Sequence, residues 1–205
     1  MMATESISSW RREERSRLLA LRMAAAPALR HRWNDAITQH LCHGFPMLGQ
    51  MVIGFYWPFK AEFDPRFAIR HWRKTGARAA LPEVVQKNAP LAFREWWPGV
   101  ATEPGVFDLP VPKGTDTLVP EAVLIPPVGF DGQGYRLGYG GGYFDRTLAA
   151  MHPQPLKIAV GFELSRIQTV YPQGHDIPMD FVVTQDGVFR ATPDGLEIVH
   201  PDRRR

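Results

Sequence analysis

The residues with the greatest potential for chemistry lie in one glycine-rich segment, residues 131–148, which reads DGQGYRLGYGGGYFDRTL. Seven of the chain's 18 glycines fall between Gly129 and Gly142, interleaved with arginine, tyrosine and aspartate. Such a backbone can turn several N–H groups toward one anion, and a helix starting directly after it adds partial positive charge. Arg136 and Arg146 could add charge-assisted contacts, while Asp145 could cap the helix or hold a magnesium ion. This pattern favours phosphate binding.

The residues around this segment predict the elements that hold it. Ala122 to Ile125 is a short apolar run typical of a buried strand, and Tyr143 to Met151 has apolar residues at helical spacing. The segment lacks the Gly-Lys-Ser/Thr of a Walker loop, and Tyr143 stands where the dinucleotide fingerprint requires a third glycine. A mobile surface loop is therefore an alternative, although arginine and aromatic residues are unusual in a plain linker.

The stretch from Pro126 to Arg146 resembles the signature of the 5-formyltetrahydrofolate cyclo-ligases, also called methenyltetrahydrofolate synthetases. That signature reads approximately P-G-(small or apolar)-x-F-D-x-x-G-x-R-L-G-x-G-x-G-Y-(Y or F)-D. The match from Phe130 to Asp145 is nearly complete, with Pro127 in place of a common glycine and Phe144 in place of a common tyrosine. The resemblance implies an ATP-dependent ligase that closes 5-formyltetrahydrofolate to 5,10-methenyltetrahydrofolate and releases ADP and phosphate.

The implied reaction requires the protein mainly to position its two substrates. A formyl oxygen is a poor leaving group, and its phosphorylation makes the formyl carbon electrophilic, so that N10 of the folate can close the ring. As in other phosphoryl transfers, the protein would orient the reactants and neutralise charge. The substrates are expected to be ATP and 5-formyltetrahydrofolate, with Mg²⁺ as the cofactor, and the G-x-S-x-G pattern of a serine nucleophile is absent.

The resemblance also implies roles for particular residues. The catalytic residues would be Arg136 and Tyr143. The residues expected to bind ATP are Arg11, Arg15, Arg136, Leu137, Gly138, Tyr139, Gly140, Gly141, Gly142, Tyr143 and Phe144. The residues expected to bind the folate are Trp57, Glu62, Tyr139, Gly140, Gly141, Gly142 and Tyr143. Asp145 and Asp180 would hold the magnesium ion, Asp180 as the last acid of an H-D-x-P-x-D run that also occurs in the family.

A helix is predicted from Trp10 to Ala25, with Arg11, Arg15 and Arg22 on one face. This face could be solvated or could meet an anion. In the cyclo-ligase family the first helix carries a basic residue followed four positions later by arginine, and both reach ATP phosphates. Arg11 and Arg15 match that spacing, although Arg11 replaces the usual lysine, and the two side chains are not equivalent at a phosphate.

Strand and helix patterns alternate through the next part of the chain. Met51 to Tyr56 and Ala77 to Leu81 read as strands, with a helix over Phe67 to Lys74 between them, which favours parallel pairing. Ligands of open α/β sheets bind beyond the carboxyl ends of the strands, where Trp57 and Glu62 stand. Trp57 could stack on a flat heterocycle or pack in the core, and Glu62 could accept ring N–H groups or be a solvated loop charge.

The second half of the chain adds further strands. A strand is expected over Leu91 to Trp97, followed by a long surface loop from Pro98 to Pro120. Lys157 to Phe162 and Phe181 to Thr184 also read as strands. Asp186-Gly187 predicts a hairpin that returns into an edge strand.

Length and composition set the class. The 205 residues suit a single domain, with about seven N-terminal and ten C-terminal residues expected to be flexible. The expected fold is a three-layer α/β domain, mostly parallel, with helices on both faces, Rossmann-like and similar to sugar-phosphate isomerases and CoA transferases. Such an isomerase or transferase, and a non-catalytic folate- or nucleotide-binding relative, are the alternative functions.

Charge and cysteine content bear on partners and location. The net charge of +3 is modest, so no nucleic-acid partner is expected. The sequence contains no apolar run of about 18 residues, so no membrane partner is expected either. Cys42 is the single cysteine, which suits a reducing compartment. The chain is therefore expected to be a cytoplasmic monomer or weak homodimer.

Overall fold

The computed structural model describes residues 4–199. The flexible tails predicted for the two ends fall partly outside these residues. Inside them, helix α1 begins at Thr4 and strand β12 reaches Ile198, so regular structure extends further toward both ends than predicted.

The described residues form helices and strands in an alternating order. The α-helices are α1 (Thr4–Ala24), α2 (Pro27–Gly44), α3 (Arg66–Arg73) and α4 (Tyr143–Ala150). The 3-10 helices are η1 (Pro46–Gln50), η2 (Val106–Asp108) and η3 (Glu163–Ser165). The strands are β1 (Val52–Gly54), β2 (Arg78–Glu83), β3 (Ala92–Trp96), β4 (Thr102–Pro104), β5 (Pro110–Pro112), β6 (Ala122–Ile125), β7 (Gly129–Phe130), β8 (Arg136–Leu137), β9 (Leu156–Val160), β10 (Phe181–Thr184), β11 (Gly187–Thr192) and β12 (Gly195–Ile198).

The main sheet has eight strands in the order β12-β11-β10-β9-β6-β1-β2-β3. Strands β10, β9, β6, β1 and β2 are parallel neighbours, while β3 at one end and β11 and β12 at the other pair antiparallel. From β1 the chain moves one way along the sheet to β2, and from β6 it moves the other way to β9 and β10. The direction therefore reverses between the carboxyl ends of β1 and β6, the usual place for a ligand in an open α/β sheet.

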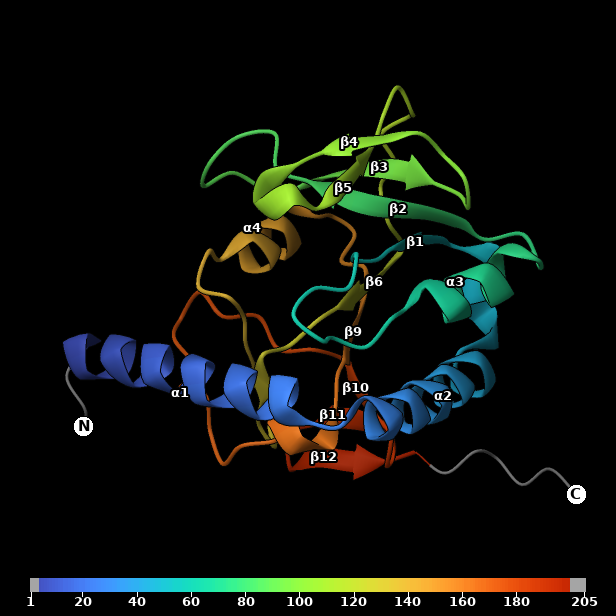
Figure 1. Cartoon of the computed structure of the whole chain (residues 1–205). Helices are drawn as coiled ribbons and strands as arrows, with labels where there is room; N and C mark the ends of the chain where they lie inside the picture. Colours follow the sequence, from blue (N-terminus) through green and yellow to red (C-terminus); the bar gives the residue numbers. More distant parts are fainter. Residues whose placement is uncertain (1–3, 200–205) are drawn as a thin grey trace, which may run out of the picture.

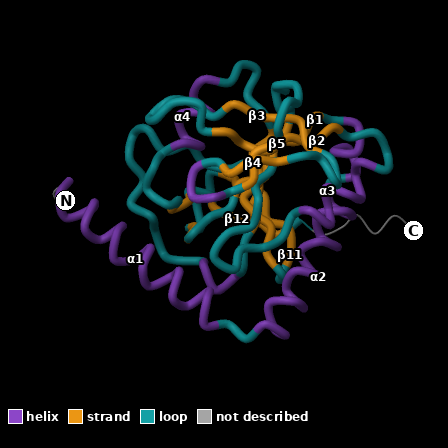
Figure 2. Tube along the Cα trace, turned by 45° about the horizontal axis from the view of Figure 1, so that its top comes forward, coloured by secondary structure: helices purple, strands orange, loops and turns teal. Residues whose placement is uncertain are grey.

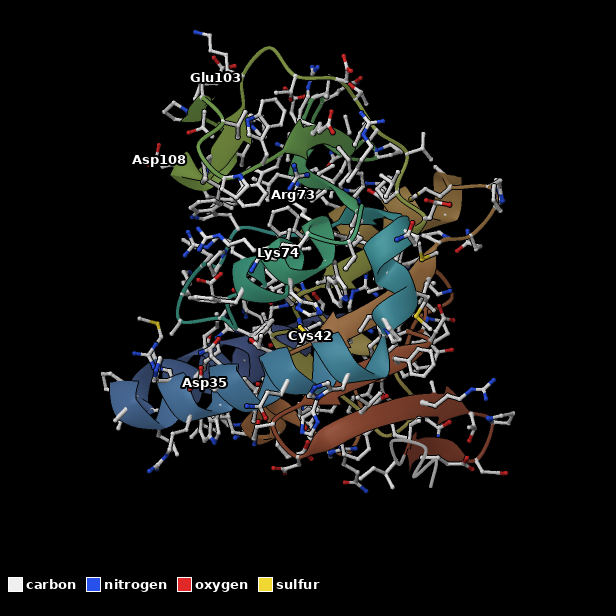
Figure 3. The ribbon with its side chains drawn as sticks, turned by 90° about the vertical axis from the view of Figure 1, so that its right-hand side faces the viewer. Asp35, Cys42, Arg73, Lys74, Glu103 and Asp108 are labelled. Atoms are coloured by element: carbon white, nitrogen blue, oxygen red, sulfur yellow. The ribbon has the colours of Figure 1, made fainter. Side chains whose placement is uncertain are left out.

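Helices cover both faces of this sheet, as predicted (Figures 1 and 2). On one face α2 and α3 bury Ile37, Leu41 and Trp72 in the larger core cluster. On the other face α4 contributes Leu148 to a second cluster. Cys42 on α2 is half-buried against the larger cluster (Figure 3). None of the helices in the described part of the chain is both long and apolar enough to cross a membrane.

Helix α1 lies apart from these two layers, and packs on the segment that follows β6. Leu18 of α1 forms a third small cluster with Val128, Leu137 and Val170. Glycine at position 129 permits this close approach, because an added Cβ would lie 2.6 Å from Leu18 Cδ1 and would force that side chain to move. The packing brings one face of α1 against the glycine-rich segment.

Three expectations about the elements are wrong in detail. The predicted loop over residues 98–120 contains the small antiparallel sheet β4–β5, which lies at the opposite end of the molecule from Asp35 on α2 (Figure 3). Strand β11 is not the edge, because β12 pairs beyond it. Strand β2 does not end before Pro82 but continues through it, pairing with β3. Strand β1 pairs only with residues 78–80, so no strand of the described residues lies beside Pro82 on that side, and the N–H that proline lacks is not needed for the sheet.

Candidate active site

The glycine-rich segment forms a hairpin followed by a tight turn into α4. Strands β7 and β8 pair antiparallel, and residues 138–142 then lead to Tyr143 at the start of the helix. Gly140 and Gly142 have φ of 96° and 63°, which other residues adopt only with strain. An added Cβ on Gly142 would also lie 2.8 Å from Nη1 of Arg146. Because these glycines carry no side chains, the loop backbone just before the N-terminus of α4 is not covered by side chains of its own.

Asp131 holds the hairpin in place, a role that the sequence interpretation missed. Its Oδ1 accepts hydrogen bonds from the N–H groups of Gln133 and Tyr135, and its Oδ2 accepts one from Val170. The residue is buried. Its position three residues before the turn glycine Gly134, with its side chain bonded to the N–H two residues on, is typical of an Asx turn, and that spacing could have indicated its role.

Arg15 meets the loop, whereas Arg11 does not contact it. The Nε of Arg15 donates to the carbonyl of Gly138 at 2.7 Å, and its guanidinium lies beside Gly140. Burial and the neighbouring charge of Arg11 lower the pKa of Arg15. Arg11 instead donates to the carbonyls of Val170 and Tyr171 and pairs with Asp176. The structure therefore brings one of the two predicted ATP-binding arginines of α1 to the glycine loop.

Arg22, which the sequence placed only on a basic face that could be solvated or meet an anion, is buried beneath the loop. Its Nη2 donates to the hydroxyl of Tyr139 at 2.7 Å, and that hydroxyl donates to Oε1 of Glu62 at 2.6 Å. The Oε2 of Glu62 accepts the N–H of Phe59 at 2.9 Å. Burial raises the pKa of Glu62 above its ordinary value, and the hydrogen bond from Tyr139 and the charge of Arg22 offset only part of that rise. Two predicted folate-binding residues, Glu62 and Tyr139, are thus in direct contact at the point where the sheet reverses direction.

Aromatic side chains extend outward from this cluster. The ring of Phe59 lies 6.0 Å from that of Tyr139 and 6.5 Å from the exposed Phe107, measured between centroids. Trp57 is half-buried against the core, and the guanidinium of Arg66 lies 4.3 Å from its ring centroid. One face of Trp57 is therefore occupied, so the structure supports the packing interpretation for that face.

Arg136 and Asp145 form an ion pair at the start of α4. The Nη2 of Arg136 lies 3.0 Å from Oδ1 of Asp145, and its Nη1 donates to the carbonyl of Ile177. The side chain of Arg136 is only 4% exposed, and burial lowers its pKa, an effect that Asp145 opposes. Arg136 therefore contacts Asp145 and the backbone carbonyl of Ile177. It could act on a ligand indirectly, through Asp145, or directly only if its side chain moved.

The two predicted magnesium ligands are held by different cations. Asp145 contacts Arg136, whereas Asp180 accepts the backbone N–H of Lys157 and pairs with its Nζ at 3.0 Å. Asp180 lies at the amino ends of β9 and β10, since it immediately precedes Phe181 and pairs with the second residue of β9. Within residues 4–199 no group of three or more metal-ligating side chains is assembled.

The remaining predicted residues divide between loop and core. Gly141 accepts a hydrogen bond from Arg146, whose guanidinium lies 5.0 Å from the ring centroid of Tyr143. The side chain of Leu137 is buried in a core cluster, and that of Phe144 packs partly buried against another. The loop face therefore consists of residues 138–143, with Arg15 and Arg146 beside it.

Fold and site together define a class: an α/β protein with a glycine-rich loop at a helix N-terminus beside a buried carboxylate. A sequence model of the 5-formyltetrahydrofolate cyclo-ligase family matches residues 7–185. The cyclo-ligase of Mycolicibacterium smegmatis is 30% identical over 179 residues, covering 83% of this chain and 91% of that protein. The cyclo-ligase of Mycoplasma pneumoniae is 30% identical over 177 residues, covering 84% and 96%.

Solved structures agree with this match. The 5,10-methenyltetrahydrofolate synthetase of Aquifex aeolicus has a TM-score of 0.76 at 26% identity, covering 95% of this chain and 99% of that one. The synthetase of Mycoplasma pneumoniae has a TM-score of 0.71 at 23% identity, covering 85% and 98%, and it supports the fold alone. The chain belongs to the 5-formyltetrahydrofolate cyclo-ligase family. The predicted family, fold and enzyme class are confirmed, and the isomerase, transferase and non-catalytic alternatives are not supported.

Proposed function

We propose that the protein is an ATP-dependent ligase that converts 5-formyltetrahydrofolate and ATP to 5,10-methenyltetrahydrofolate, ADP and phosphate. Family membership supports the reaction. The observation that supports this reaction at the glycine loop is the 2.6 Å hydrogen bond from Tyr139 to Glu62. This bond joins the glycine loop to the segment after β1. Two substrates that must react with each other need two such surfaces side by side.

ATP phosphates would bind at the backbone of residues 138–142 and at the N-terminus of α4. Arg15 is already against this loop, and Arg146 lies on its other side. Both arginines donate to loop carbonyls, so their remaining N–H groups are the ones proposed to meet phosphate oxygens. Arg11 would contribute through the field of its charge and not by contact, because it pairs with Asp176.

The folate would bind on the side of Glu62. The pterin ring carries neighbouring N–H donors, and a carboxylate offers about four acceptor sites, of which two are occupied here. Phe59, Tyr139 and the free face of Trp57 supply aromatic surface for the ring. A folate bound in this way would bring its formyl group near the loop proposed to bind the phosphates.

The chemical steps require no protein nucleophile. The formyl oxygen attacks the γ-phosphorus and ADP leaves, which leaves the formyl oxygen phosphorylated and its carbon electrophilic. N10 then attacks that carbon and the C–N bond forms; the original formyl oxygen departs with the phosphate, and N10 gives up its proton. The chain's residues hold the reactants in line and neutralise charge, with Tyr143 at the helix start and Arg136 fixing Asp145.

Magnesium is the proposed cofactor, and Asp145 fits it better than Asp180. Mg²⁺ commonly takes one or two carboxylates, with phosphates and waters completing its shell. Asp145 lies in the first turn of α4 beside the loop and is 20% exposed, whereas Asp180 is committed to Lys157 at the amino end of the sheet. Bound there, the ion would shield phosphate charge.

Location and assembly are also proposed. The enzyme would work in the cytoplasm, the reducing compartment that suits a chain with one half-buried cysteine, as a monomer or weak homodimer acting on free small molecules. Cell fractionation and light scattering would test these two statements.

The reaction itself is tested by following methenyltetrahydrofolate absorbance with 5-formyltetrahydrofolate and Mg-ATP. We expect the absorbance to rise, with one ADP and one phosphate released per product. Omission of ATP should abolish the rise. Hydrolysis of ATP without folate product, or no change in absorbance, would reject the proposed function.

A further inference from the structure

We infer that Arg22 is a positioning residue of this site, which holds Glu62 and Tyr139 in the arrangement that receives the folate ring. The inference rests on the proposed function and assigns a residue that lies outside the loop signature. Tyr139 itself stands at a position that the family signature leaves open, R-L-G-x-G.

The hydrogen bonds run in one direction, from Arg22 to Glu62. The guanidinium donates to the Tyr139 hydroxyl at 2.7 Å, and the hydroxyl then has its single proton left for Oε1 of Glu62. Since Phe59 N–H binds Oε2, both oxygens of Glu62 act as acceptors. Arg22 thus fixes which way the tyrosine proton points, and the tyrosine fixes the carboxylate as an acceptor.

Arg22 also joins the two segments that diverge at the reversal point of the sheet. Its Nε donates to the carbonyl of Lys60 at 3.0 Å, and its Nη1 to the carbonyl of Pro127 at 3.3 Å. Lys60 belongs to the segment after β1, where φ of Lys60 and Ala61 are 46° and 59°. A left-handed backbone at two successive residues needs such external support. One side chain therefore sets the separation of the folate-binding and phosphate-binding segments.

The charge of Arg22 matters because Glu62 is buried. The nearest atoms of the two groups are 3.8 Å apart, too far for a direct hydrogen bond, so the attraction acts alongside the tyrosine link. Burial raises the pKa of Glu62, and Arg22 opposes it. A protonated Glu62 would present a donor to the pterin N–H groups, and the contact would be lost. Loss of Arg22 should therefore weaken folate binding most at acidic pH.

Other groups facing Glu62 do not replace this charge. Tyr139 and Tyr56 are neutral phenols, and Tyr56 donates to the carbonyl of Phe63. The ammonium of Lys60 lies 5.1 Å from the centroid of the Phe59 ring. Asp64 is paired with Arg66. Arg22 is the cation that the structure places in contact with the Glu62–Tyr139 pair within residues 4–199.

The test compares Arg22→Gln with Arg17→Gln, which removes an arginine from the exposed face of the same helix. Arg17 contacts Glu14 only, among the bonds of the described residues. For Arg22→Gln we expect KM for 5-formyltetrahydrofolate to rise about tenfold or more, with a smaller change for ATP. The acidic limb of kcat/KM for folate should move to higher pH by about one unit. Arg17→Gln should leave both quantities unchanged.

Two further variants separate positioning from a structural role. Arg22→Lys retains the charge but loses the planar fork, so it should keep the acidic limb near that of the parent while KM stays raised. Tyr139→Phe cuts the link without removing Arg22 and should raise KM for folate even if Arg22→Gln does not fold. Equal increases in both KM values with an unmoved acidic limb, or parental kinetics in Tyr139→Phe, would overturn the inference. Turnover by the parent enzyme is measured first, so failure of the proposed function is seen separately.

Discussion

At the scale of single residues, the Arg136–Asp145 pair combines stability with the proposed magnesium site. A guanidinium that is 4% exposed needs a counter-charge, and Asp145 provides it from the first turn of α4. The carboxylate also accepts the backbone N–H of Ile177. Asp145 is therefore oriented before any ion binds, at the helix end where negative charge is favoured.

Asp145→Asn should reduce kcat by at least about 100-fold and raise the magnesium concentration needed for half-maximal rate. The amide keeps the shape but removes the charge, so the unfolding free energy should also fall by about 2 kcal/mol. Rates measured against free Mg²⁺, together with urea unfolding, check both effects. Chelation of the metal should abolish parental turnover.

Asp180→Asn is the matched comparison, because it alters a carboxylate at the amino end of the sheet. We expect the magnesium dependence of this variant to stay close to that of the parent. A shift as large as that of Asp145→Asn would show that Asp180 also acts on the metal. The roles of both residues stay predictions until this comparison is made.

The sequence could predict the residues whose neighbours in the chain define them. Arg15 and the loop glycines follow from spacing and turn chemistry, and the structure brings them together. Arg22 lay on the predicted stripe, yet its partners Lys60, Pro127 and Tyr139 come from distant segments that only tertiary packing joins. The same reason explains why the pairing of Arg11 with Asp176 was not foreseen.

At the scale of elements, the turn into α4 depends on Gly142. Gly142→Ala should lower the unfolding free energy by about 1–2 kcal/mol, because an L-residue in the left-handed region is strained. The new methyl would also displace Arg146 from Gly141 and raise KM for ATP. Denaturant unfolding and steady-state kinetics measure the two effects.

Gly174→Ala is the control for this prediction. An added Cβ at Gly174 meets no atom within 4 Å, and its φ lies outside the left-handed range. Its stability should therefore match that of the parent within about 0.5 kcal/mol. If Gly142→Ala were equally neutral, the strained turn would not be needed for folding.

Elements with a clear hydrophobic period were predictable, and those defined by long-range pairing were not. The predicted strands near residues 51–56, 122–125 and 181–184 correspond to β1, β6 and β10. Strands β4 and β5 are three residues each and rich in proline, so they carry no usable period. They exist because they pair with each other across a turn at residues 105–109.

At the scale of the whole molecule, the Arg11–Asp176 pair ties α1 to the segment before β10. Burial would raise the pKa of Asp176, but hydrogen bonds from Arg11 and the Gln173 N–H outweigh it, so the pKa is lowered. A lowered carboxyl pKa stabilises the fold above the unfolded-state value of about 3.9. That contribution is lost as the pH falls through the lower folded-state value.

Asp176→Asn should therefore unfold at lower urea concentration than the parent at pH 7, with the difference shrinking below about pH 4. The expected loss at neutral pH is about 1–2 kcal/mol for a largely buried pair. Urea unfolding at a series of pH values checks this. A difference that stayed constant down to pH 2 would mean that the charge of Asp176 contributes nothing.

The architecture as a whole was predictable from alternating strands and helices, and the structure confirms the mostly parallel sheet with helices on both faces. The antiparallel strands at each end of the sheet were only partly foreseen. Strand β3 pairs antiparallel with β2, and its side chains alternate between the two faces of the sheet. The residues of β2 that it pairs with depend on tertiary packing, which the sequence of β3 alone does not show. The position of α1 also depends on distant partners.

Three of the arginines of α1, Arg11, Arg15 and Arg22, have a consequence for how the protein is made. Residues 11, 15 and 22 leave the ribosome early, whereas Val170, Gly138 and Tyr139, to which they donate, are synthesised much later. The first helix therefore waits for its partners through most of translation, and α1 docks only after β6 and the glycine loop exist. Assembly of the active site is thus coupled to completion of the chain, so unfinished chains lack a formed binding surface for either substrate.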